Sequence, residues 1–143
     1  SELESEKLEF SKYALNNLHG TMLRDFGGSL DYVQYLLISE STENYKINSS
    51  IIQNSDKLFR VSIAPNGETI EEIVANGENY DLKYIISNEI PGYFHPITDT
   101  LYDNYEQHPY LKKIFDSDSQ GFKKLKIKVF EIDYEKFNKL INE

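Results

Sequence analysis

The sequence of 143 residues contains no cysteine and no tryptophan. Without cysteine, the chain cannot form a disulfide, a thiolate metal site or a cysteine nucleophile. This absence leaves the cellular compartment open, because it suits a cytosolic protein as well as an extracytoplasmic domain that folds without disulfides.

Long hydrophobic runs are also missing. No apolar stretch approaches the roughly 20 residues that a membrane-spanning helix needs. The first ten residues, SELESEKLEF, are charged from the second residue onward, which does not fit a signal peptide. We therefore expect a chain without a membrane span of its own, and this expectation is compatible with its being one part of a larger protein.

Positive charge is scarce, with 15 basic against 24 acidic residues and a net charge of −9. An acidic domain repels phosphate backbones and anionic lipids, so nucleic acid is not an expected partner. The one lysine cluster alternates with apolar residues, which indicates the solvent face of a strand. Its members are Lys123, Lys124, Lys126 and Lys128.

The length and the 39% of hydrophobic residues fit a single domain with its own core, over residues 1–143. Helical and strand patterns alternate along it. Strands are predicted at 21–26, 57–64, 82–87 and 125–133. Helices are predicted at 2–18, from Ser29 onward, at 69–76 and at 134–143, with one or two short helices in 97–116 and a turn at 117–120.

This alternation predicts an α/β fold, in which helices flank a layered, mixed and mostly parallel sheet of about four strands. The apolar run Tyr84-Ile85-Ile86 indicates a strand covered on both faces. The last strand, 125–133, is a candidate edge strand and a candidate antiparallel one. The predicted core comprises Leu18, Leu23, Leu36, Val61, Ile63, Ile73, Tyr84, Ile86, Ile127 and Val129.

No motif supplies a complete catalytic site. The chain has no G-x-S-x-G elbow and no phosphate-binding loop with its lysine, so we predict no catalytic residue and no cofactor. His95, Asp99 and Asp103 are spaced four apart, but Pro96 places His95 before the helix, so a solvated acidic face is favoured over a metal site. His108 precedes Pro109 and is expected at a junction between two helical pieces.

A ligand, if there is one, is expected beyond the carboxyl ends of the parallel strands. The turn Gly27-Gly28-Ser29 and nearby Asp31 follow the first predicted strand. Tyr93, Phe94 and His95 follow the third, and aromatic faces beside carboxylates suit sugar rings. A purely structural turn, with the aromatic side chains packed under the loop, is the alternative interpretation.

The segment from Glu68 to Tyr134 resembles a known family. A helix leads into the strand phrase KYII, a helical insert follows, and then comes HPYLKKIFDSDSQGFKKLKIKVFEIDY. This arrangement is similar to the last part of the soluble domains that follow the membrane spans of polytopic, lipid-phosphate-sugar-dependent glycosyltransferases of the dolichyl-phosphate-mannose type. The helix, strand and glycine turn near the N-terminus resemble the opening of such domains.

The resemblance implies a non-catalytic, extracytoplasmic accessory domain of an integral-membrane glycosyltransferase-like protein. The family's catalytic acidic residues lie in a loop after its first membrane span, and no residue of this chain matches them. The implied partners are the membrane-embedded part of the same polypeptide and a glycan or protein acceptor. The alternative is a small acidic cytosolic interaction protein, such as a toxin-neutralising immunity protein or a phage inhibitor, that fits a basic active site.

Overall fold

The computed structural model describes residues 1–23, 28–30, 32–33, 36, 59–62, 67–89 and 97–143. The longer helices in this part of the chain are α1 (Glu2–Asn17), α4 (Ile70–Gly77) and α6 (Tyr134–Ile141). Each begins at a residue whose side chain accepts a hydrogen bond from a backbone N–H of the first turn, as helix caps do. These caps are Ser1, Thr69 and Asp133.

The strands form one sheet in the order β2-β1-β3-β5-β4. Their bounds are β1 (Gly20–Leu23), β2 (Phe59–Ser62), β3 (Leu82–Asn88), β4 (Leu111–Asp116) and β5 (Ile127–Ile132). β1 pairs in parallel with β2 and β3, whereas β5 pairs antiparallel with β3 and β4. The predicted mixed α/β fold is confirmed, but the sheet is half antiparallel rather than mostly parallel.

Two strand predictions are corrected. β5 is antiparallel, as considered, but it is not an edge strand, because β4 lies beyond it. β4 was predicted as helix within 97–116, where the helical part is limited to α5 (Leu101–Asn104) and η3 (Tyr105–Gln107). The described residues also form the 3₁₀ helices η2 (Glu78–Tyr80) and η4 (Ser117–Gln120), and η4 occupies the predicted turn.

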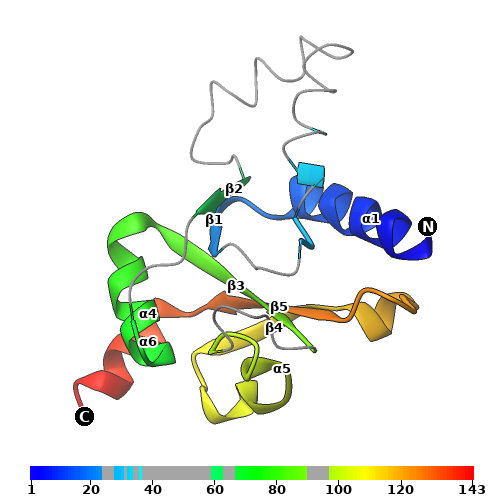
Figure 1. Ribbon diagram of the computed structural model, residues 1–143. Helices are drawn as coiled ribbons and strands as arrows, with labels where there is room; N and C mark the ends of the chain where they lie inside the picture. Colours follow the sequence, from blue (N-terminus) through cyan, green and yellow to red (C-terminus); the bar gives the residue numbers. More distant parts are fainter. Residues whose placement is uncertain (24–27, 31, 34–35, 37–58, 63–66, 90–96) are drawn as a thin grey trace, which may run out of the picture.

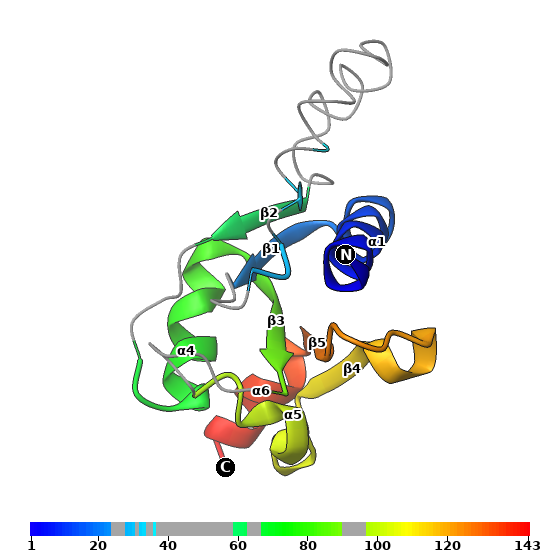
Figure 2. The same ribbon diagram turned by 45° about the vertical axis from the view of Figure 1, so that its right-hand side comes forward.

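The sheet lies between two layers of helix. Figures 1 and 2 show α1 on one side and α4, α5 and α6 on the other. Alternate residues of β3 and β5 point to the two layers: Tyr84 and Val129 belong to the cluster with α1, whereas Ile85 and Phe130 belong to the cluster with α4 and α6. The central strands are therefore apolar on both faces, as the run at 84–86 predicted.

The predicted core is confirmed at Leu18, Leu23, Ile73, Tyr84, Ile86, Ile127 and Val129, all of which are buried. Leu36 is only partly buried, so its prediction is wrong. The side chain of Val61 and all of Ile63 lie outside the described residues. Buried residues that the prediction did not include, such as Phe10 and Phe137, are provided by the amphipathic faces of α1 and α6.

A buried carboxylate attaches α1 to the loop before β5. Glu6 is 7% exposed, and its two carboxylate oxygens accept hydrogen bonds from the backbone N–H groups of Lys123, Lys124 and Leu125 at 2.8, 2.6 and 2.9 Å. Burial raises the pKa of Glu6, but these three bonds together with the nearby Lys126 outweigh burial and hold the pKa below its usual value. The carboxylate is therefore ionised at neutral pH.

Glu6→Gln is expected to lower the free energy of unfolding by about 2 kcal/mol at pH 7, because the charge-assisted bonds to three N–H groups are weakened. The folded-state pKa lies below the unfolded value of about 4.3, so this stability is present above that pH and lost as pH falls through the folded pKa. Urea unfolding of both proteins from pH 7 to pH 3 should show the gap closing in acid. A constant gap would contradict this explanation.

Gly77→Ala is expected to destabilise the fold by about 2 kcal/mol, because overpacking a filled core forces side chains to shift. A Cβ at Gly77 would lie 2.4 Å from Cδ2 and 2.8 Å from Cβ of Leu82, which is fully buried. Gly121→Asn is the control, because nothing lies within 4 Å of a Cβ there and asparagine tolerates its φ of 74°. In thermal unfolding, the Tm of Gly77→Ala should be well below that of Gly121→Asn. Equal decreases in Tm for the two variants would refute the packing argument.

Candidate functional site

The turn after β1 meets the carboxyl end of β3. Gly28 has a φ of 76°, a left-handed conformation that glycine adopts without strain. The next residue, Ser29, is fully buried, and its hydroxyl donates a hydrogen bond to the side-chain carbonyl of Asn88 at 3.3 Å. Since Asn88 is the last residue of β3, the chain that follows one parallel strand is bound to the end of its neighbour.

Asp99 adds a third segment to this end of the sheet. The backbone N–H of Asn88 donates to Oδ1 of Asp99 at 3.1 Å. The buried hydroxyl of Ser87 donates to the backbone carbonyl of Asp99 at 3.2 Å. We name Ser29, Ser87, Asn88 and Asp99 the rim cluster. Ser29 and Ser87 are fully buried, so the groups that can reach a ligand are the partly exposed amide of Asn88 and carboxylate of Asp99. Both groups hydrogen-bond to hydroxyls, and they lie where α/β sheets bind ligands.

The structure places part of the predicted site in the rim cluster. Ser29 belongs to the cluster and Gly28 directly precedes it, at the expected end of the sheet. The other predicted site residues lie outside the described residues: Gly27, Asp31, Tyr93, Phe94 and His95. Ser87 was missed, although a polar residue at the end of an apolar strand is a usable signal, and Asn88 was not among the named site residues. Asp99 was weighed as a metal ligand and as part of a solvated acidic face, and the second interpretation was favoured.

The triplet of His95, Asp99 and Asp103, for which a solvated acidic face was favoured over a metal site, is only partly described. Within the described residues, no group of three or more histidine or acidic side chains could hold a metal ion. His95 lies outside them, so the triplet itself is not tested. Asp99 accepts a hydrogen bond from Asn88, whereas Asp103 is exposed on α5.

A second polar cluster joins α4 to the segment before β4. Nδ1 of His108 lies 3.1 Å from the hydroxyl of Tyr110 and 3.2 Å from Oε1 of Glu71, and the Tyr110 hydroxyl donates to the same Glu71 oxygen at 3.3 Å. Burial and then the negative charge of Glu71 raise the pKa of Tyr110, so its phenol stays protonated. His108 lies between η3 and β4 rather than between two helical pieces, and it has two partners that the sequence did not reveal.

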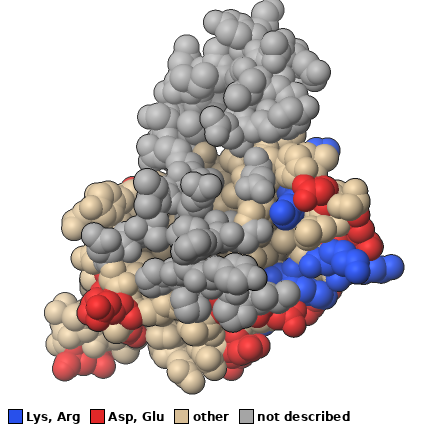
Figure 3. Space-filling model, in the orientation of Figure 1, with Lys and Arg blue, Asp and Glu red and all other residues tan. Residues whose placement is uncertain are grey.

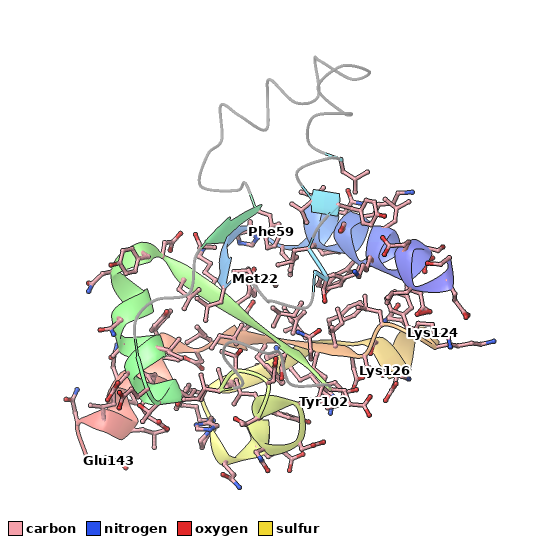
Figure 4. The ribbon with its side chains drawn as sticks, viewed as in Figure 1. Met22, Phe59, Tyr102, Lys124, Lys126 and Glu143 are labelled. Atoms are coloured by element: carbon pink, nitrogen blue, oxygen red, sulfur yellow. The ribbon has the colours of Figure 1, made fainter. Side chains whose placement is uncertain are left out.

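The lysine cluster divides into three environments. Lys123 and Lys124 are exposed in the loop before β5, where Figure 4 shows Lys124 pointing away from the molecule. Lys126 forms an ion pair with Asp118 at 2.7 Å. Lys128 lies over the ring of Tyr102, with Nζ 4.1 Å from the centroid and 2.8 Å from the Tyr102 carbonyl oxygen. The prediction of one solvent-facing strand therefore fails, since three of the four, Lys123, Lys124 and Lys126, precede β5.

Comparisons with protein-family models, with curated proteins and with solved structures each find no match for this chain. Among the residues that the structure describes, no helix has both the length and the apolar character needed to cross a bilayer. The candidate site therefore rests on its own geometry.

Asp99→Ala is expected to lower the free energy of unfolding by about 1.5 kcal/mol, because it removes the acceptor of a partly buried backbone N–H. Amide hydrogen exchange at Asn88 should become faster, while exchange at the middle of β3 stays slow. Asp103→Ala, which deletes an exposed carboxylate four residues along, is the control. It should leave the free energy of unfolding and the exchange rate at Asn88 unchanged. Unaltered exchange at Asn88 in Asp99→Ala would show that the bond does not hold this end of β3.

Proposed function

We propose that the chain is a non-catalytic, extracytoplasmic accessory domain of an integral-membrane glycosyltransferase-like protein, and that its rim cluster contacts glycan or acceptor. Its partners are the membrane-embedded part of the same polypeptide and the acceptor that the enzyme modifies. The glycosyl transfer itself belongs to the membrane part.

The observation that supports the proposal is the order and pairing of elements from Glu68 onward. α4 leads through the short η2 into β3, and the helical insert with α5 and η3 follows. The β4–β5 antiparallel pair completes the sheet. This order corresponds segment by segment to the phrases that resemble the family. The phrase LKKIFD forms β4, and IKVFEI forms β5.

The rim cluster is the part of the domain best suited to a glycan. The partly exposed Asn88 and Asp99 are already held by bonds to each other and to the buried Ser29 and Ser87, so little ordering entropy would be lost on binding. A sugar offers hydroxyl donors and acceptors to these groups and apolar C–H patches to aromatic rings. Tyr93 and Phe94 follow β3 and lie between Asn88 and Asp99 in the sequence.

The second candidate function is an acidic interaction protein that fits a basic partner. The net charge of −9 favours it, because charge complementarity accelerates association and selects partners. The coding sequence immediately upstream of Ser1 separates the two candidates. Several in-frame apolar runs of about 20 residues support the membrane protein, and a native start codon at this position contradicts it.

Titration with short neutral mannose oligosaccharides tests the glycan contact. Amide shifts in the ¹⁵N-labelled protein are expected at Ser29, Asn88 and Asp99, because these residues form the rim cluster. Asp99→Ala should reduce the shifts at the other two positions, whereas Asp103→Ala should not. An absence of shifts at millimolar sugar, or shifts centred on residues 123–128, would contradict the proposed contact.

A further inference from the structure

The loop that receives Glu6 has the geometry of an anion-binding site. Three successive backbone N–H groups, at residues 123–125, point at one carboxylate with donor–acceptor distances from 2.6 to 2.9 Å. Successive N–H groups that converge in this way form a concave nest with partial positive charge, and such nests bind phosphate and other oxyanions in many proteins.

The side chains around the nest carry the same sign of charge. Two of the three N–H groups belong to Lys123 and Lys124, whose side chains are exposed, and Lys126 follows the third. Figure 3 shows basic atoms gathered at this end of a molecule whose visible charge is otherwise mostly acidic. An anion at the nest would therefore meet favourable charge that the rest of the acidic chain does not offer.

Contacts that do not involve Glu6 also hold the loop. Backbone N–H groups on both sides of the nest donate to Ser117: that of Ile127 to the hydroxyl at 2.9 Å, and that of Phe122 to the carbonyl at 3.1 Å. Nζ of Lys126 donates to the Phe122 carbonyl at 3.3 Å. Because these contacts bracket residues 123–125, we expect the nest to keep its shape when the carboxylate is removed.

We propose that residues 123–125 form an oxyanion-binding site, which the carboxylate of Glu6 occupies in this structure and which can accept a phosphate or carboxylate group in its place. In this arrangement the carboxylate of Glu6, on α1, fills the site when no ligand is bound. A ligand with an exposed phosphate or carboxylate would compete with Glu6 for the same three N–H groups and would loosen α1 from the loop.

Chemical rescue of Glu6→Ala tests the site. The variant should unfold at a lower temperature than the wild type, and inorganic phosphate at five times its Kd should raise the variant's Tm by about 3 °C. The wild type should gain less, because its nest is filled. Sodium chloride at matched ionic strength should not reproduce the gain, and sodium acetate in a parallel titration separates a carboxylate preference from a phosphate preference.

Two further variants serve as the control and as a substitute in case Glu6→Ala does not fold. Glu9→Ala removes an exposed carboxylate from the same helix and should respond to phosphate as the wild type does. If Glu6→Ala does not fold, Glu6→Gln serves instead, and amide shifts at residues 123–125 on phosphate addition are the readout. Equal phosphate responses in wild type and variant, or shifts spread over the lysine side of the molecule without a maximum at 123–125, would overturn the proposal.

Discussion

One buried carboxylate determines how the N-terminal helix is attached to the sheet. Glu6 bonds to three N–H groups that lie 117 to 119 residues further along the chain. The same helix inserts Phe10 and Ala14 into the core against β3 and β5, and both residues are fully buried. Apolar burial supplies most of the attraction between α1 and the sheet, but it is not directional. The carboxylate adds a directional contact that fixes where along the sheet the helix lies.

The insert between β3 and β4 is fixed at its two ends and in the middle. Asp99 bonds to the end of β3, Tyr110 bonds to Glu71 of α4, and Lys128 of β5 lies against Tyr102. These contacts use different chemistry, and each reaches a different element. Because the insert is held in this way, the side chains of the rim cluster are already in place before a ligand binds. That property is consistent with a binding surface that changes little when a ligand arrives.

Sequence periodicity predicted the elements in which the buried residues form a regular, uninterrupted pattern. The run Tyr84-Ile85-Ile86 identified β3, because a strand covered on both faces places consecutive apolar residues in a core. β4 escaped prediction because Lys112 and Lys113 interrupt its apolar pattern and a bulge shifts the register between Lys113 and Phe115. The rim position of Ser29 followed from the general geometry of α/β sheets. The role of Glu6 could not be predicted, since acidic residues near the start of a helix also suit the helix dipole and the partners of Glu6 are backbone groups remote in sequence.

The ionisation of Glu6 within the folded protein is the most direct test of this central contact. ¹³C-detected NMR can follow the Glu6 side-chain carboxyl during a pH titration, together with the amide signals of residues 123–125. The contact predicts a Glu6 midpoint below the usual glutamate value of about 4.3 and amide shifts at 123–125 with the same midpoint. A Glu6 midpoint at or above that value, or amides at 123–125 that do not follow it, would contradict the central role of the carboxylate.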